Sequence, residues 1–122
     1  MNLLAKLSAK KQDELIDEII EKWNEILSDI DVTKLEAAQN LIEEAAFMQV
    51  TLSELKNKIK REGATYVMKN GKQNMRVEHP AQKSYNTMIN RYTTACNHLI
   101  ALLPKDEKVV VTDKDGDDFD DF

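Results

Sequence analysis

The stretch "ATYVMKNGKQNMRVEHPA", from Ala64 to Ala81, separates two long segments that have helical periodicity. Asn70-Gly71 in its middle is the strongest short-range signal for a β-hairpin, because both residues of such a tight turn adopt positive φ angles. His79-Pro80-Ala81 at its end predicts a new helix, since proline is favoured at the first helical position. The stretch therefore predicts a short β-hairpin over about residues 64–77, inserted between helices.

The pairing register of this hairpin follows from the turn. A two-residue turn at Asn70-Gly71 places Lys69 opposite Lys72 and Thr65 opposite Arg76. Side chains alternate between the two faces of a strand, so this register separates an apolar face from a basic face. The apolar face holds Ala64, Tyr66, Met68, Met75 and Val77, and the other face holds Thr65, Val67, Lys69, Lys72, Asn74 and Arg76. Because a lone hairpin is marginal in water, we expect the apolar face to pack on the helices or on a neighbour's strands.

The sequence before the hairpin predicts two long amphipathic helices. Apolar residues recur at steps of three and four from about Ser8 to Ile30, which indicates the first helix. Thr33-Lys34-Leu35-Glu36 has the form of a capping box, in which the threonine and glutamate side chains accept from each other's backbone amides. The second helix is expected to run from there to about Glu62, where Gly63 supplies the positive φ that commonly ends a helix.

The third helix is expected to start at His79-Pro80-Ala81 and to continue towards Pro104. The resulting fold class is mainly α: a long antiparallel helical hairpin plus a third long helix, with a short two-stranded β-hairpin before the third helix. Residues 1–104 form one domain in this reading. Residues 105–122 are strongly acidic, and their composition predicts a disordered tail.

Length and composition set further bounds. The chain has 122 residues, about one domain, and its modest core makes oligomerisation a plausible source of stability. Its one cysteine, Cys96, cannot form a disulfide within the chain, which fits a reducing compartment. We find no secretory signal and no apolar run near the roughly 18 residues needed to span a bilayer. The expectation is a soluble cytosolic protein, without membrane partners.

The net charge of −5 conceals an uneven distribution. Residues 1–54 hold five basic and twelve acidic side chains, whereas residues 55–77 hold seven basic side chains and one acidic. A basic segment of this kind suits an anionic partner, although a solvated helix end and turn would show the same charges. The residues that could contact such an anionic partner are Lys56, Lys58, Lys60, Arg61, Lys69, Lys72 and Arg76.

Motifs for catalysis, metals and cofactors are missing from the sequence. There is no glycine-rich phosphate loop, no His-Glu-x-x-His and no paired-cysteine spacing. Cys96 and His98 lie two residues apart on a predicted helix and do not face each other, so Cys96 is expected in the core. His79 is expected to cap or pack, and Trp23 to anchor the core or an interface. We therefore predict no catalytic residue, no metal site and no cofactor.

Several of these features occur together in a known family. The run from Gly63 through Asn70-Gly71, His79-Pro80-Ala81 and Tyr85-Asn86 to Leu103-Pro104 resembles the phage terminase small subunits common in phages of Gram-positive hosts. The resemblance covers roughly residues 35–105. Many small terminases also carry an N-terminal helix-turn-helix, whereas the first 54 residues here are acidic and show no recognition helix. This departure moves the expected DNA contacts to the basic segment.

The resemblance implies a non-enzymatic factor for viral DNA packaging. Such subunits assemble into homo-oligomeric rings, bind viral double-stranded DNA at the packaging start, and recruit or regulate the large terminase subunit, which carries the ATPase and nuclease. The alternative from another class is a helical structural or adaptor oligomer with no nucleic-acid role, favoured by the acidic first helix.

Overall fold

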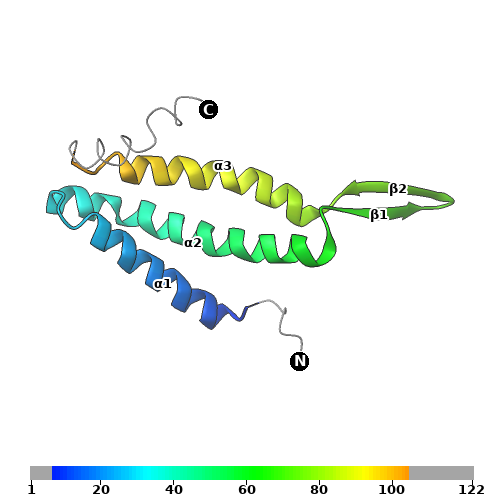
Figure 1. Cartoon of the computed structure of the whole chain (residues 1–122), viewed down its shortest axis with the longest axis horizontal. Coiled ribbons are helices and arrows are strands. Elements are labelled where there is room, and N and C mark those ends of the chain that lie inside the picture. Colours follow the sequence, from blue (N-terminus) through cyan, green and yellow to red (C-terminus); the bar gives the residue numbers. More distant parts are fainter. Residues whose placement is uncertain (1–6, 105–122) are drawn as a thin grey trace.

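Three helices and one β-hairpin follow each other along the chain in the computed structural model, which describes residues 7–104. The elements are α1 (Ala9–Ile26), α2 (Val32–Glu62), β1 (Thr65–Asn70), β2 (Gln73–Glu78) and α3 (Pro80–Ile100). The long helix α2 is central. A tight connection joins α1 to α2, α1 packs against α2, and α3 runs back along α2 (Figure 1). The fold class predicted from the sequence is confirmed.

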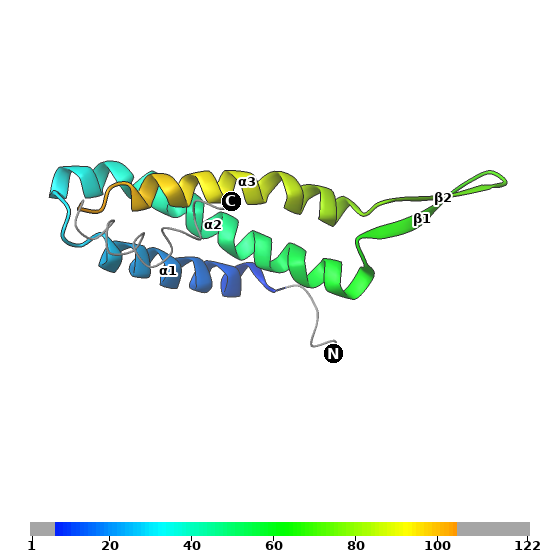
Figure 2. The ribbon, with the colours of Figure 1, turned by 45° about the horizontal axis from the view of Figure 1, so that its top comes forward.

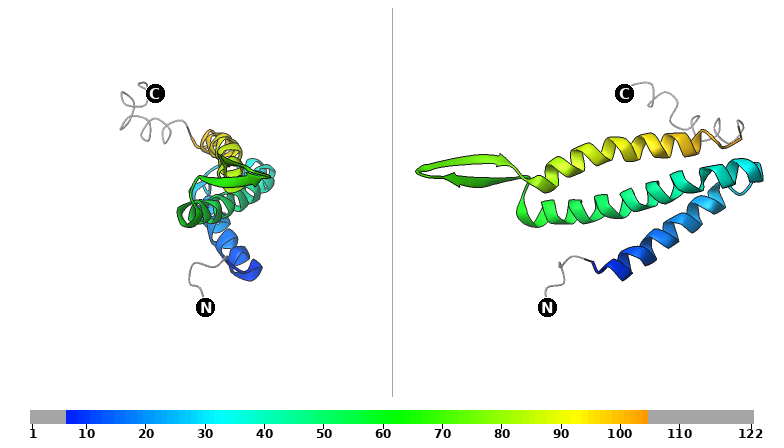
Figure 3. Two further views of the ribbon diagram at one scale, coloured as in Figure 1. Left: turned by 90° about the vertical axis from the view of Figure 1, so that its right-hand side faces the viewer. Right: turned by 180° about the vertical axis from the view of Figure 1, so that it is seen from behind.

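The hairpin projects from one end of the helices. It continues the long axis of the α2–α3 pair, beyond the last turn of α2 and the first turn of α3 (Figures 1 and 2). At the other end, the α1–α2 connection brings the three helices together, and α1 diverges from α2 towards its own N-terminus (Figure 3).

The beginning of α2 differs from the prediction. Asp31 is the N-cap, and its Oδ2 accepts a hydrogen bond from the backbone N–H of Thr33 at 3.2 Å. The helix therefore starts at Val32, and the predicted capping box from Thr33 to Glu36 is wrong. Aspartate is at least as good an N-cap as threonine, and its use here extends the helix.

The other helix ends are close to their predicted places. α1 starts at Ala9, next to the expected start at Ser8, whose side chain caps the helix by accepting from the N–H of Lys11 at 3.1 Å; the helix ends at Ile26 rather than Ile30. α2 ends at Glu62 as predicted, because Gly63 adopts a φ of 87°. α3 ends at Ile100, where hydrogen bonds between residues three apart tighten the chain before Pro104.

The core lies at the end where α1 turns into α2. Its buried members are Leu27, Ala38, Ile42, Ala45, Ala95 and Leu99. The alanines let α2 and α3 approach closely, and the larger side chains of Leu27, Ile42 and Leu99 fill the space between the helices with no exposed surface. Trp23 packs against this cluster, as predicted, whereas Cys96 is only half-buried.

The strand register also differs from the prediction. The observed pairs include Met68 with Met75 and Lys69 with Asn74, so the turn is Gly71-Lys72 rather than Asn70-Gly71. The physical reason is that Gly71, with a φ of 63°, is the one residue of this turn with positive φ. A type II′ turn needs positive φ only at its first central position, and that position takes the glycine.

The shift in register leaves the two faces of the hairpin unchanged. Each residue of β1 pairs with a residue two positions further along the chain than predicted, and side chains two positions apart lie on the same face of a strand. Tyr66 now pairs with Val77, and Met68 with Met75, on the face predicted to be apolar. Because Lys72 lies in the turn, the predicted like-charge pair of Lys69 and Lys72 does not form across the strands.

Candidate nucleic-acid interface

The hairpin is joined to the helices through His79. The Nδ1 atom of His79 accepts from the N–H of Ala81 at 3.0 Å and caps α3, as predicted. Since Nδ1 accepts, the proton lies on Nε2, which donates to Oε1 of Glu62 at 2.7 Å. The backbone N–H of His79 donates to the carbonyl of Ala64 at 2.7 Å, and its ring meets that of Tyr66 edge-on at 5.8 Å. One buried side chain thus connects the end of α2, the base of the hairpin and the start of α3.

The charge of Glu62 fits this arrangement. The hydrogen bond from His79 lowers the pKa of the Glu62 carboxyl below its ordinary value of 4.5, and the nearby charges of Lys58 and Arg61 act in the same direction. Desolvation opposes the shift but does not outweigh it. Glu62 is therefore ionised at neutral pH and is a stable acceptor for the histidine.

Beyond this joint, the hairpin makes little contact with the helices. Tyr66, Met68 and Met75 expose 36%, 43% and 48% of their surface. Of the two expected arrangements, packing of the apolar face on the helices of the same chain is therefore not observed, and contact with a neighbour's strands stays a prediction. The hairpin extends beyond the end of α2 and the start of α3, along the long axis of these two helices. Neither face of the hairpin therefore lies over a helix (Figure 1).

The hairpin carries three of the predicted DNA-binding residues. Lys72 lies in the turn and Lys69 is two residues before the turn, so both are at the tip and exposed. Arg76 is exposed on the same face as Lys69, and its Nη1 donates to Oγ1 of Thr65 at 2.9 Å. Glu78 shares this face near the base, but Asn86 of α3 donates to its carboxylate at 3.2 Å. The positive charge therefore increases towards the tip.

The four predicted residues on α2 divide between two sides of the helix. Lys56 and Lys60 are four residues apart and lie on one side, and the Nζ of Lys56 is 6.0 Å from the ring centre of Tyr85 on α3. Lys58 and Arg61 are three apart and lie on another side, next to Glu62. All four are exposed, but the structure does not bring them into one patch with the hairpin lysines.

The seven residues are spread along the axis of the molecule. Six residues of α2 span about 9 Å, and the strands add about 17 Å, so the basic groups extend over about 25 Å. Such a spread does not converge on a small anion. It suits a polyanion, because duplex DNA presents a charge about every 1.7 Å along its axis.

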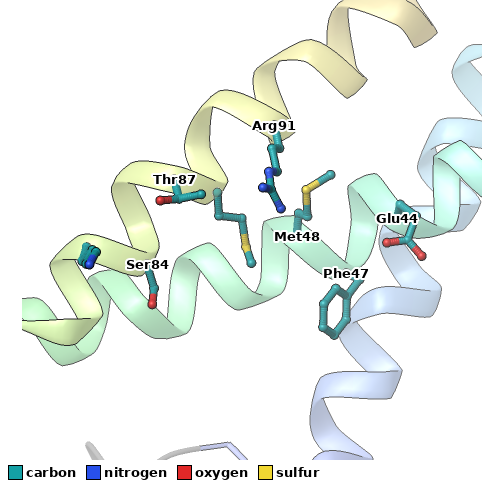
Figure 4. Close-up of a pocket in the computed structure, with 8 residues that line it drawn as sticks. Glu44, Phe47, Met48, Ser84, Thr87 and Arg91 are labelled. Atoms are coloured by element: carbon teal, nitrogen blue, oxygen red, sulfur yellow. The ribbon is translucent and has the colours of Figure 1, made fainter.

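Two further cations were not singled out from the sequence. Lys83 and Arg91 of α3 line a groove of about 670 Å³ between α2 and α3, together with Phe47, Met48 and Met88. Figure 4 shows Arg91 reaching from α3 towards Met48 on α2. Phe47 gave a signal in the sequence: it is a large aromatic residue next to the apolar stripe of α2 rather than in it, and it is 49% exposed.

Residues 7–104 contain no group of three histidine, cysteine, aspartate or glutamate residues placed as metal ligands would be. None of the helices described there is both long and apolar enough to cross a membrane. Comparisons with protein-family models, with curated proteins and with solved structures found no match.

Proposed function

We propose that this protein is a small terminase subunit, a non-enzymatic factor that binds viral double-stranded DNA and recruits or regulates a large terminase subunit. The sequence run from Gly63 to Pro104 supports the family. The observation that carries the DNA-binding role is the hairpin, which projects into solvent with Lys69, Lys72 and Arg76 on it.

A projecting hairpin is a suitable shape for reaching a DNA backbone. Its tip is clear of the acidic face of α1, whose carboxylates would repel phosphates. Lysine and arginine side chains displace counterions from DNA, so binding through them is strong at low salt and independent of sequence. A few cations on one subunit give weak affinity, and repetition of the hairpin in an oligomer multiplies it.

Exposed apolar side chains support assembly of several copies. At the end where the core lies, Ile26, Val32 and Ile100 expose 51%, 68% and 39% of their surface. At the other end, the hairpin exposes its methionines. These exposed groups support the proposal in so far as ring assembly would cover them.

Native mass measurement with and without DNA from the packaging start of the viral genome tests this proposal. The expected result is a closed homo-oligomer that gains the mass of the DNA, and co-purification with the large subunit. A protein that stays monomeric and does not bind DNA would contradict the proposal.

A helical adaptor without a nucleic-acid role is the second candidate. Its support is the acidic face of α1, on which Lys11 and Glu14 form the one ion pair found within the described helix, at 3.7 Å. The remaining carboxylates of that face would suit a basic protein partner. The same experiment separates the two functions, since an adaptor forms its oligomer and gains no DNA mass.

A further inference from the structure

The groove between α2 and α3 has an apolar floor open to solvent. Met48 and Met88 are half-buried in it, and Phe47 at its edge is 49% exposed. Figure 4 shows Met48 on the side of α2 that faces α3, whereas the ring of Phe47 lies on the other side of the α2 ribbon. An apolar floor of this kind accepts aromatic or aliphatic side chains from another segment.

The rim of the groove on the α3 side is basic. Lys83 and Arg91 lie eight residues apart, which places them about 12 Å from each other along the helix. Within residues 7–104, no ion pair joins either of them to a carboxylate. Glu44 is the one acidic residue among those that line the groove. The groove therefore favours a ligand that carries both apolar groups and negative charge.

The chain itself contains such a segment. Residues 117–122 read Asp-Asp-Phe-Asp-Asp-Phe, a repeat in which each phenylalanine follows two carboxylates. In a polyproline II conformation three residues make one turn, so Phe119 and Phe122 would point to the same side, about 9 Å apart. The two carboxylate pairs also repeat every three residues, at a spacing comparable to that of the two cations on the rim.

The connection is long enough for the segment to reach the groove of its own chain. Twelve residues separate Pro104 from Asp117, and they span up to about 40 Å when extended. The path back along α3 from Ile100 to Lys83 is about 26 Å. The segment can therefore cover the whole groove without strain in the connection.

We infer that residues 117–122 bind the α2–α3 groove of the same chain, with the phenylalanines over Met48 and Met88 and the carboxylates beside Lys83 and Arg91. This interaction goes beyond the proposed packaging function and does not depend on it. The acidic segment covers an apolar surface, and its binding weakens with salt because charge contributes to it.

The methyl groups of the methionines can report on where residues 117–122 bind. Of the five, Met48 and Met88 lie in the groove, whereas Met68 and Met75 lie on the hairpin. A nitroxide label on the full chain, attached at Gly116→Cys in a Cys96→Ser background, is combined with isotope-labelled methionine methyl groups. The expected result is selective paramagnetic broadening of Met48 and Met88.

Two sets of variants control this measurement. Phe119→Ser with Phe122→Ser leaves the sequence of residues 7–104 unchanged and should reduce the broadening at Met48 and Met88 to the level at Met68. Lys83→Glu with Arg91→Glu should do the same, while Lys22→Glu with Lys34→Glu, an equal charge change elsewhere, should not.

Two outcomes would overturn the inference. Broadening of Met68 and Met75 in place of the groove methyls would place the acidic segment on the hairpin. Shifts of Met48 and Met88 that follow protein concentration, and persist without the two phenylalanines, would show that a second copy occupies the groove.

Discussion

The two ends of the α2–α3 pair differ in how their apolar residues are used. At one end, Leu27, Ile42 and Leu99 have no exposed surface, and three helices surround them. At the other end, the hairpin keeps Tyr66 and Met68 more than a third exposed, and a single buried histidine attaches it to the helices. The first end stabilises the fold, and the second is available for contact with other molecules.

This difference makes stability and binding separable by mutation. Substitutions in the core should change unfolding and leave the hairpin surface intact. Substitutions on the hairpin should change binding and leave unfolding nearly unchanged. The joint at His79 lies between the two regions and should show an intermediate effect.

The largest effect on stability is expected from Leu99→Ala. This change removes a fully buried side chain between α2 and α3 and leaves a cavity, so the free energy of unfolding should fall by about 2–5 kcal/mol. Urea unfolding followed by circular dichroism measures it. Ile100→Ala, at a neighbouring residue that is 39% exposed, is the control and should cost much less. Equal losses would contradict the placement of the core.

His79→Ala should have a smaller effect. It removes the side chain that caps α3 and the hydrogen bond to Glu62, and loss of a cap typically costs about 0.5–2 kcal/mol. His79→Asn keeps a capping oxygen and should recover most of this loss in the same unfolding measurement. If the asparagine variant is as unstable as the alanine variant, the cap is not the main contribution.

The Glu62 carboxyl should make the joint sensitive to acid. Its pKa is lowered in the folded state, so the stabilisation is fully present above its ordinary pKa of 4.5 and is lost as the pH falls through the lowered value. The difference in unfolding free energy between the wild type and Glu62→Gln should therefore be constant near neutral pH and shrink below pH 4.5. A difference that does not change with pH would show that ionised Glu62 contributes nothing.

The smallest effect is expected on the hairpin. Met68→Ser with Met75→Ser removes an exposed cross-strand pair, worth about 0.2–1 kcal/mol to the hairpin itself. At a protein concentration too low for assembly, global unfolding should change by less than about 0.5 kcal/mol, as is usual for surface substitutions, while hairpin amides exchange faster with solvent. A large loss of stability at that concentration would mean that these methionines are buried within a single chain.

Local signals in the sequence were sufficient for the order of the elements. Helical periodicity, Gly63 after the second helix and Pro80 at the start of the third are each properties of a few neighbouring residues. The start of α2 was missed because Asp31 and Thr33 are both good N-caps and only the folded chain selects one. The hairpin register was missed because Asn70-Gly71 and Gly71-Lys72 both provide a glycine with positive φ.

Features that depend on distant segments were not predictable in the same way. The exposure of the hairpin follows from the direction in which α2 and α3 leave the joint, which no local pattern encodes. The groove requires Met48 and Met88, forty residues apart, to lie side by side. The basic residues could be named from their charge and DNA as their partner from the family resemblance, but the division of four of them between two sides of α2 follows only from the position of the helix in the fold.

The most direct test of the proposed function is the salt dependence of binding to duplex DNA. The hairpin variant reverses three charges through Lys69→Glu, Lys72→Glu and Arg76→Glu. The matched control reverses the charges of Lys10, Lys22 and Lys34, which are also exposed but do not belong to the basic segment. We expect weaker binding for the hairpin variant, with a slope of log affinity against log salt that falls in magnitude by about 1 for each lost phosphate contact. The control should keep the wild-type slope. Equal slopes for the wild type and the hairpin variant would contradict a DNA interface on the hairpin.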